Sequence, residues 1–383
     1  MRLNRRLLLI LLFATLINTA CMGLRVDVPL LAIHLGASTL TVGVLMGMFG
    51  VLPALFSVQS GRWIDRVGTA RPMLVSAAAM TLCMLGGWLY PTLPMLFVMT
   101  PLYSLAFTMF TLSNYAAVAA IGAPEERSAN FSWLSMTGGI ANAVGPIIAG
   151  YMIDGLGHGA TFALLAAGPA LTAAVILVLR QQRAAPPATA RKEPAGRAFD
   201  LMRRPQVVGP LIAGAVISLG FDVFSFLVPV YGSSINLPAS AIGNIVGAMG
   251  VSVMLVRLFM PLVVRVFKPW QLVYGNLLLG AAVFLVFPFA SALLLLVLLS
   301  LVYGVTYGIL QPVLTALLAD AAPAGRGGEA LGLRFTLQNG IHAVIPALFG
   351  VVGALLGTLP AFWCVGALMA AAGWTARAKW SKA

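Results

Sequence analysis

Long apolar runs, separated by short polar or charged connections, divide the chain into twelve segments. They are 7–35, 41–61, 72–90, 94–120, 129–153, 159–180, 207–233, 239–265, 270–289, 292–320, 329–355 and 358–378. An α-helix needs roughly 20 apolar residues to cross a bilayer, which is the scale of these runs. The runs do not alternate apolar and polar residues as the strands of a transmembrane β-barrel must, and Leu293–Leu299 is an example. The pattern predicts an all-α polytopic membrane protein with twelve transmembrane helices.

The composition agrees with this fold class. Of the 383 residues, 60% are hydrophobic and 9% are charged, whereas soluble domains carry about 25% charged residues. This excludes a water-soluble enzyme and a disordered chain. The chain has no Gly-rich phosphate loop and no nucleophile–base pair, and the cysteines Cys21, Cys83 and Cys364 lack metal-ligand spacing. We therefore predict no enzymatic activity, no cofactor and no metal, and we expect lipid to surround the protein.

Positive charge is distributed unevenly along the chain. The net charge is +13, and with the N-terminus inside, all of the 23 Lys and Arg residues except Arg25, Arg257 and Arg334 fall on the inner side. Cytoplasmic connections of membrane proteins carry such an excess of Lys and Arg. We predict a multi-pass protein of a bacterial-type inner membrane with both termini in the cytoplasm. Because the charge reflects topology, it does not indicate nucleic-acid binding.

A polar stretch separates the sixth segment from the seventh. Residues 181–206 include Pro186, Pro187 and Pro194 among several basic residues, a composition typical of a solvated linker. The sequence therefore predicts an N-terminal six-helix bundle at 1–180, a cytoplasmic linker at 181–206 and a C-terminal six-helix bundle at 207–383.

The two predicted bundles are related by an internal repeat with an offset of 200 residues. Matching pairs are Pro29 and Pro229, Gly43 and Gly243, Gly47 and Gly247, Gly50 and Gly250, Tyr103 and Tyr303, Ala143 and Ala343, Pro146 and Pro346, and Phe162 and Phe362. One register kept across six spans indicates two pseudo-symmetric bundles. Such bundles can face each other across an axis along the membrane normal and enclose a site near the midplane.

The connection after the second segment carries a motif. It reads Gly61-Arg62-Trp63-Ile64-Asp65-Arg66-Val67-Gly68-Thr69-Ala70-Arg71. This resembles the G-x-x-x-D-R-x-G-R-[RK] signature of the major facilitator superfamily. The matching residues are Gly61, Asp65, Arg66 and Gly68, while Thr69 and Ala70 replace two basic residues and Arg71 supplies part of that charge. The resemblance covers the whole chain, since the family also has twelve spans in two halves joined by a central linker.

The family resemblance implies a role for Asp65 at the inner face. There it would meet the start of the eleventh segment, where exposed amide groups and the helix dipole favour an anion. Arg334 lies one turn into that segment. We hypothesise that Asp65 holds the inner side closed through this helix start, with Arg334 as a second partner. The alternative is that these charges only set the topology.

The fifth segment carries a second motif. Gly145, Pro146 and Gly150 match a G-x-x-x-G-P-x-x-G-G pattern found in antiporter branches of the superfamily, and Ala141 and Ala149 replace glycines. Small residues allow close helix packing, and proline bends a helix. The resemblance to the drug:proton antiporter branch favours export by exchange, and ordinary small-residue packing is the alternative.

Few ionisable residues lie inside the segments, where such groups are costly and usually functional. Arg25 and Asp27 lie late in the first segment, and Asp222 lies beyond the middle of the seventh. Arg25 can pair with Asp222 or with Asp27, and both carboxylates are candidates for reversible protonation during transport. The alternative is a permanent ion pair that positions helices.

The chain also has three histidines. His342 lies in the middle of the eleventh segment and could titrate near neutral pH, although a satisfied core histidine is the more common case. His34 and His158 lie at the predicted outer boundary and indicate nothing specific.

Polar and aromatic residues of the first, fourth, seventh and tenth segments are the predicted lining of a central cavity. They are Asn18, Tyr103, Asn114, Tyr115, Phe221, Phe226, Tyr303, Tyr307 and Gln311. Aromatic walls with few hydrogen-bonding groups suit an amphipathic organic solute, and packing within the bundle is the alternative for each residue.

Taken with the family resemblance, these features predict a secondary active transporter that works by alternating access. We expect a monomer that moves a small organic molecule across the inner membrane by proton-coupled efflux. One alternative is an importer or facilitator of an organic anion, with Arg25, Arg257 or Arg334 near the solute. A second is a non-transporting membrane sensor or scaffold built on the same fold.

Overall fold

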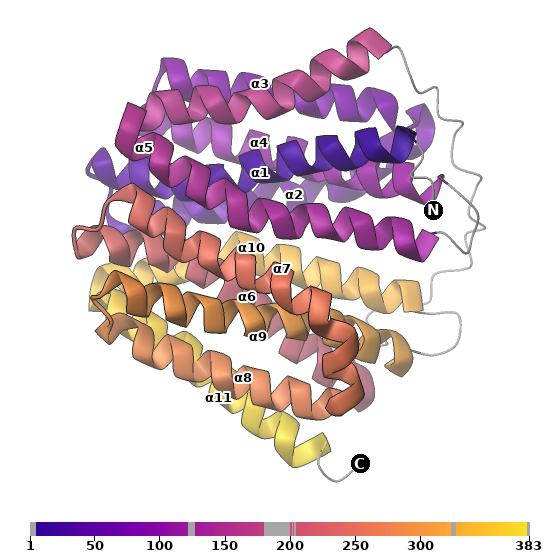
Figure 1. Cartoon of the computed structure of the whole chain (residues 1–383), viewed down its shortest axis with the longest axis vertical. Coiled ribbons are helices and arrows are strands. Elements are labelled where there is room, and N and C mark those ends of the chain that lie inside the picture. The colour runs from indigo at the N-terminus through magenta and orange to yellow at the C-terminus, as the bar shows by residue number, and fades with distance from the viewer. Residues whose placement is uncertain are drawn as a thin grey trace.

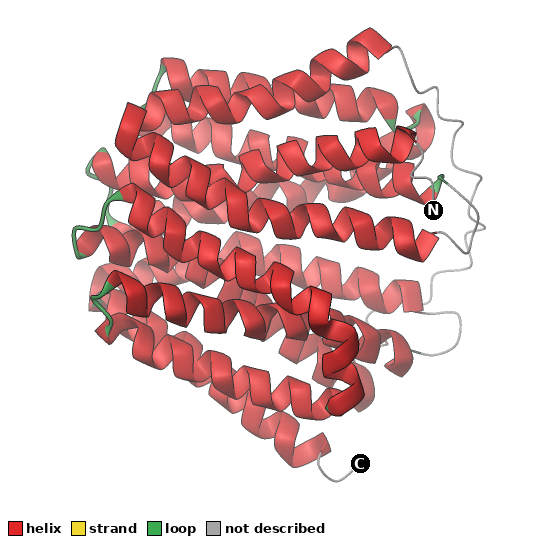
Figure 2. Cartoon of the chain, in the orientation of Figure 1, coloured by secondary structure: helices red, strands yellow, loops and turns green. Residues whose placement is uncertain are grey.

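The computed structural model describes residues 5–121, 127–179, 200, 202, 204–322 and 327–380, and these residues are almost entirely helical (Figure 2). The helices are α1 (Arg5–His34), α2 (Thr39–Val67), α3 (Ala70–Leu89), α4 (Leu93–Ala119), α5 (Arg127–Leu179), α6 (Pro205–Ser234), α7 (Ala239–Val266), α8 (Pro269–Val286), α9 (Leu293–Ala321), α10 (Gly327–Leu356) and α11 (Thr358–Trp380), with a short 3-10 helix at Phe287–Phe289. Within the described part of the chain, 11 helices are long and apolar enough to cross a membrane. The prediction of an all-helical polytopic membrane protein is therefore supported.

Helix α5 takes in two of the predicted spans. It runs through 53 residues, which at about 1.5 Å per residue is more than twice the thickness of a bilayer core. Gly157 interrupts its helical geometry, with φ 80° and ψ 172°. A positive φ of this size favours glycine, because a Cβ would be strained there. The predicted segments 129–153 and 159–180 thus lie on either side of a kink and have no separate loop between them.

The helices run side by side in two groups. Figure 1 shows α1–α5, in indigo to magenta, above α6–α11, in pink to yellow. We refer to residues 5–179 as the first half and to residues 204–380 as the second half. Across the two halves, α2 packs against α10 and α5 packs against α7. These two pairs are the main contacts between the halves.

The two ends of the molecule are named here by residues. The His34 end is where α1 ends and α2 begins at Thr39, and the Arg66 end is where α2 ends and α3 begins at Ala70. Helix α1 starts and α11 finishes on the same side, which is the Arg66 end (Figure 1).

The internal repeat appears in the contacts between the halves. A Cβ added to Gly43 would lie 2.6 Å from the carbonyl oxygen of Pro346, and one added to Gly243 would lie 2.4 Å from that of Pro146. Both distances are far below normal contact, so only glycine allows the helices to come this close. The four residues form two pairs that are 200 positions apart, so equivalent residues make equivalent contacts.

Two further repeat positions follow the same rule. A Cβ on Gly47 would lie 2.8 Å from the carbonyl oxygen of Ala343, and one on Gly247 would lie 2.8 Å from that of Ala143. The aromatic matches of the repeat are also alike in burial, because all of them are fully buried in the hydrophobic core. They are Tyr103, Tyr303, Phe162 and Phe362.

Candidate functional site

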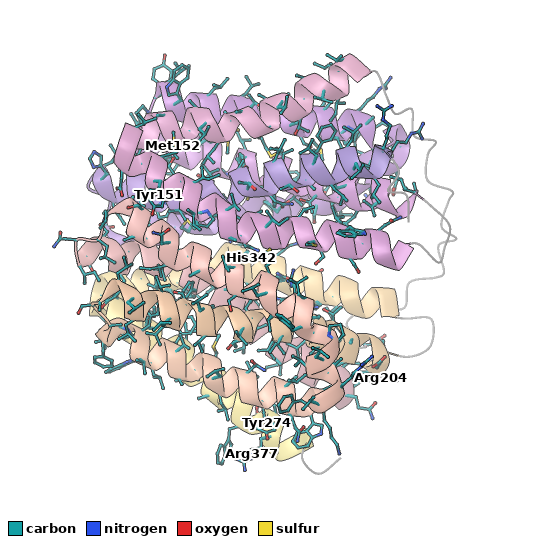
Figure 3. The ribbon with its side chains drawn as sticks, viewed as in Figure 1. Tyr151, Met152, Arg204, Tyr274, His342 and Arg377 are labelled. Carbon is teal, nitrogen blue, oxygen red and sulfur yellow. The ribbon has the colours of Figure 1, made fainter. Side chains whose placement is uncertain are left out.

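Three ionisable side chains meet where the halves face each other. Arg25 of α1 places Nη1 3.5 Å from Oδ1 of Asp222 in α6, and Nδ1 of His342 in α10 contacts the other oxygen, Oδ2, of the same carboxylate. Figure 3 places His342 between the two groups of helices. The Asp222 side chain is 3% exposed, whereas those of Arg25 and His342 are 17% and 18% exposed. We call these three residues the central cluster.

Burial explains why these groups are found together. An isolated charge inside a membrane protein is expensive, and such residues pair with one another and face the interior. The Arg25 guanidinium also lies over the ring of Phe49 in α2, 5.5 Å from its centroid, a distance at which a cation is attracted by the ring. Arg25 therefore contacts both halves, through Phe49 in the first and Asp222 in the second.

Two partners, Asp222 and Asp27, were predicted for Arg25. Its partner in the structure is Asp222 and not Asp27. His342 joins the cluster, although its position in the sequence favoured an ordinary core histidine. The signal that could have pointed to it is its place in the middle of a span, at the same depth as a carboxylate in another span.

Asp27 belongs to a different pair. Its Oδ1 lies 2.5 Å from Nδ1 of His158, and its side chain is 0% exposed. His158 lies in α5, directly after the kink at Gly157, and sequence analysis assigned it no role. The two carboxylates predicted as proton-binding candidates therefore have separate surroundings.

A cavity of about 150 Å³ adjoins the central cluster. Arg25 and His342 contribute to its walls, together with the polar residues Ser104, Thr108 and Asn339. Its apolar wall includes Cys21, Met22, Phe49, Pro53 and Phe107. The cavity is smaller than the roughly 300–1,000 Å³ of pockets that hold drug-sized ligands.

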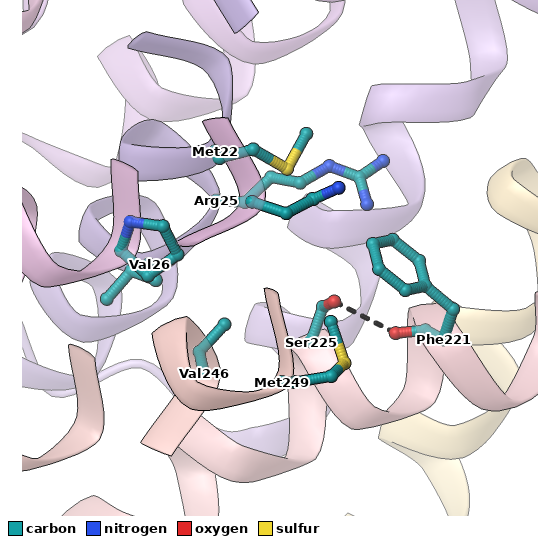
Figure 4. Close-up of a pocket in the computed structure, with 9 residues that line it drawn as sticks. Met22, Arg25, Val26, Phe221, Ser225, Val246 and Met249 are labelled. Carbon is teal, nitrogen blue, oxygen red and sulfur yellow. Dashed lines mark hydrogen bonds between the residues drawn. The ribbon is translucent and has the colours of Figure 1, made fainter. Parts of the chain in front are cut away.

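A second space lies on the other side of Arg25. It measures about 10 Å³ and is lined by residues of α1, α5, α6 and α7 (Figure 4). In this view Arg25 and Phe221 face each other. The hydroxyl of Ser225 donates a hydrogen bond to the backbone carbonyl oxygen of Phe221. Phe221 was predicted to line a cavity, and it contributes to the wall of this one.

The other predicted lining residues pack elsewhere or contribute to other contacts. Tyr103, Phe226 and Tyr303 are fully buried in the core, and Asn114 is nearly so. Tyr307 stacks on Phe221 at 4.7 Å, Tyr115 is 48% exposed and stacks on Phe131, Asn18 is half-buried, and Gln311 accepts a hydrogen bond from Arg334. Residue type alone does not show which face of a helix a side chain occupies.

A third cavity, of about 260 Å³, lies between α5 and α7 towards the Arg66 end. Its lining includes Ser135, Gly139, Met254 and Arg257, and Arg257 donates from Nη1 to Oγ of Ser135 at 3.3 Å. At the same end, Cβ atoms added to Gly61 or Gly138 would meet no atom within 4 Å. The close glycine contacts between the halves, by contrast, lie in the parts of α2 and α7 nearer the His34 end.

The superfamily-like motif is largely helical and not a loop. Helix α2 continues to Val67, and Gly68 ends it with a φ of 80° and a hydrogen bond from its N–H to the carbonyl oxygen of Ile64. Asp65 is exposed, as are Arg66 and Arg71. No partner for Asp65 is found among the described residues.

Arg334 bonds to α9 and not to Asp65. It is 9% exposed, and its guanidinium donates to Thr315 Oγ1 and to Gln311 Oε1, both on α9. The hypothesised contact between Asp65 and Arg334 is not made in this conformation, so their role as an inner gate stays a prediction.

The antiporter-like motif lies where three helices converge. A Cβ on Gly145 would lie 2.6 Å from the carbonyl oxygen of Thr19 in α1, and one on Gly150 would lie 2.4 Å from that of Ala239 in α7. Pro146 lies between them inside α5. The motif therefore lets α5 approach the other half and α1 at once.

One polar contact between the halves was not predicted. Asp154 of α5 accepts hydrogen bonds from the backbone N–H groups of Ala239 (2.9 Å) and Ser240 (2.8 Å), at the start of α7. The first N–H groups of a helix have no partner within the helix, and the helix dipole favours an anion there. Nothing in the local sequence of either segment indicates this pairing, because it depends on how α5 and α7 pack.

Comparison with known families agrees with the helical arrangement. The family model described as Major Facilitator Superfamily matches residues 8–346. The chain belongs to the major facilitator superfamily. No curated protein matches the sequence closely enough to add a named relative.

Solved structures of superfamily-type transporters share this fold. A mutant of the nucleoside transporter NupG superimposes with a TM-score of 0.82 at 14% identity, covering 98% of this chain and 100% of that one. A mutant of the peptide transporter POT gives 0.83 at 17% identity, with 98% and 94% coverage. A bacterial homolog of the human lysosomal transporter Spinster, in an inward-facing and occupied conformation, gives 0.79 at 12% identity, with 98% and 97% coverage. At these identities the likeness establishes the fold alone.

Proposed function

We propose that this superfamily member is a proton-coupled secondary transporter that exports a small organic molecule across a bacterial-type inner membrane. The observation that carries the proposal is the central cluster. It places one buried carboxylate between an arginine and a histidine, on helices of both halves, and beside a cavity. A proton-coupled transporter needs such a group, because the carboxylate can bind and release a proton as the two halves move.

The proposal includes a topology. We take the two parts of α5, before and after Gly157, as separate spans, which gives twelve spans in two pseudo-symmetric six-helix bundles. With both termini in the cytoplasm, the His34 end is the outer side and the Arg66 end is the inner side. The close glycine contacts between the halves, in the parts of α2 and α7 nearer the His34 end, then correspond to a transporter closed to the outside.

The chemistry follows from charge balance at Asp222. When Asp222 is ionised, it neutralises Arg25 and draws α1, α6 and α10 together. When it binds a proton, Arg25 loses its counter-ion, and the contact between the halves weakens. The proton and the solute then each stabilise one arrangement of the two halves at the expense of the other ligand. This couples the two fluxes without any covalent step.

Proton flux in liposomes tests this proposal. Purified protein is reconstituted with a pH-sensitive dye inside, and a panel of small amphipathic solutes is added with and without a pH gradient. We expect solute-dependent proton movement that falls about 100-fold or more in Asp222→Asn, as is typical for loss of a proton-transfer group. Asp320→Asn is the matched control, since Asp320 is an exposed carboxylate near the end of α9. Coupling at the parent's rate in Asp222→Asn would exclude Asp222 from the mechanism.

An organic anion is the second candidate substrate, with transport as import or facilitated diffusion. It is favoured by the guanidinium of Arg25, whose side chain is 17% exposed and contributes to the wall of the adjoining cavity. A carboxylate or a similar anion in the adjoining cavity could accept from this group. Solute flux that follows the membrane potential, needs Arg25 and ignores the pH gradient would favour this candidate over proton-coupled export.

A further inference from the structure

A second titratable site lies apart from the central cluster, around Asp27. This carboxylate is fully buried, it contacts His158 through Oδ1, and its Oδ2 has no hydrogen-bond partner among the described residues. Helices α2, α4, α5 and α6 all pack against α1. Of the described charged and titratable side chains on these helices, only His158 on α5 forms an ion pair with Asp27, while Asp222 on α6 faces Arg25.

A histidine connects this pair to the surface. His34, the last residue of α1, is exposed, and its ring centroid lies 5.6 Å from that of His158. His158 itself is 16% exposed. The three side chains thus form a series of decreasing exposure, from His34 through His158 to Asp27, and imidazoles are suited to pass protons near neutral pH.

The same site adjoins the contact that holds the halves together at the His34 end. His158 directly follows Gly157, where α5 loses helical geometry. On the other side of this kink, Asp154 accepts the two hydrogen bonds from the start of α7. A movement of His158 relative to Asp27 would therefore move the part of α5 that follows the kink. Asp154, in the part before the kink, stays bonded to α7.

We propose that Asp27 and His158 form a proton-binding site that controls closure at the His34 end, with His34 as its entrance. The site would bind a proton from external water, and this assignment of sides rests on the topology in the proposed function. With one proton between them, the two groups form either an ion pair or a neutral hydrogen bond, and the closed end tolerates both. Without that proton, Asp27 is an uncompensated buried carboxylate, which is strongly unfavourable. Opening of the His34 end to water relieves that cost.

The sign of the pH dependence follows. Raising the pH removes the shared proton and favours the open His34 end, and lowering the pH favours the closed one. One linked proton changes the closed-to-open ratio by at most about tenfold for each pH unit. Protonation of Asp154 would act in the opposite direction, because it would weaken the bonds to α7 at low pH. The direction of the change therefore distinguishes the two carboxylates.

Distances between spin labels measure this equilibrium without a known substrate. Labels are placed at Tyr90→Cys and Leu294→Cys, which are 67% and 71% exposed near the His34 end of either half, in full-length protein whose native cysteines are replaced by alanine. We expect the long-distance population to grow with pH in the parent. In Asp27→Asn, which mimics the protonated state, we expect the short distance at every pH. His158→Gln keeps a hydrogen-bond donor but cannot titrate, so we expect a displaced transition midpoint.

The controls separate this inference from the proposed function. Asp222→Asn and Asp154→Asn should keep a transition of the parent's sign, because neither removes the Asp27 site. If Asp27→Asn does not fold, as judged by gel filtration and thermal unfolding, His158→Gln carries the test. A parent without a pH transition, or a transition unchanged in both Asp27→Asn and His158→Gln, would overturn the inference. Loss of proton-coupled flux alone would not, because the label distances are measured without transport.

Discussion

The two main interfaces between the halves use equivalent glycines but differ in their polar contacts, and most clearly at the start of one helix. In α2 with α10 and in α5 with α7, glycines 200 positions apart meet carbonyl oxygens 200 positions apart. Helix α7 begins after Pro238, which has no side chain that can cap it, and Asp154 from the other half accepts its first N–H groups. Helix α2 begins after Ser38, whose hydroxyl accepts from Thr41 N at 3.2 Å.

This difference distinguishes the packing contacts that both halves share from the polar contacts that one half alone provides. The position equivalent to Asp154 is Ala354, whose side chain cannot accept a hydrogen bond. The repeat therefore provides close packing at both interfaces, while only the α5–α7 interface, of the two in the described part of the chain, links the halves through a charged side chain. We infer that both interfaces contribute to closure at the His34 end. Polar contacts regulate this closure at the α5–α7 interface.

Bulky substitutions at the repeat glycines should have the largest effect. A Cβ on Gly43 or Gly243 would overlap backbone atoms of the other half at 2.6 or 2.4 Å. We expect Gly43→Val and Gly243→Val each to destabilise the closed form by about 3 kcal/mol, the upper range for overpacking. Label distances at the His34 end measure this, and Gly61→Ala, where the space is open, is the control. A large effect in one variant only would show that the two interfaces are not equivalent.

Removal of the Asp154 contact should have an intermediate effect, confined to one interface. We expect Asp154→Ala to lower the stability of the closed form by about 1 kcal/mol, the typical value for loss of a helix cap, since Asp154 is exposed to solvent. The same label distances report the change, and raised salt should reduce the difference between variant and parent. An unchanged distance distribution at low salt would mean that packing alone closes this interface.

Transfer of the contact to the other interface should have the smallest effect. In the double variant Ser38→Ala with Ala354→Asp, the start of α2 loses its own cap and gains a carboxylate at the position equivalent to Asp154. We expect the new carboxylate to recover about 0.5 kcal/mol of the stability lost in Ser38→Ala alone. Thermal unfolding of the two variants side by side measures this. No recovery would show that the α10 end does not approach α2 as α5 approaches α7.

Much of the fold could be predicted from the sequence, because lipid imposes simple rules on length and polarity. Apolar runs located the helices, and glycine and proline matches pointed to contacts that the structure makes between Gly43 and Pro346 and between Gly243 and Pro146. The end of the second segment was predicted less accurately, at residue 61, whereas α2 continues to Val67. Ile64 is 2% exposed, so packing extends α2 through residues that the charge pattern assigned to a connection.

The candidate site was harder to predict, because its residues are distant in sequence. Arg25 was assigned two possible partners, and only the packing of α1 against α6 selects Asp222 over Asp27. His158 lies 131 positions from Asp27, and no local pattern connects them. Tyr103 and Tyr303 were expected in a cavity because they are polar aromatics in central spans, yet both rings face the core.

Cys21 gives the protein a natural chemical reporter. It contributes to the wall of the cavity beside Arg25 and His342, while Cys83 and Cys364 lie outside that lining and can be replaced. Cys21 is buried, so a small water-soluble alkylating reagent would react with it only when this cavity opens along the proposed transport pathway. The rate of its modification would therefore count the openings of that pathway, and slower modification in the presence of a compound would identify a transported solute without isotope labelling.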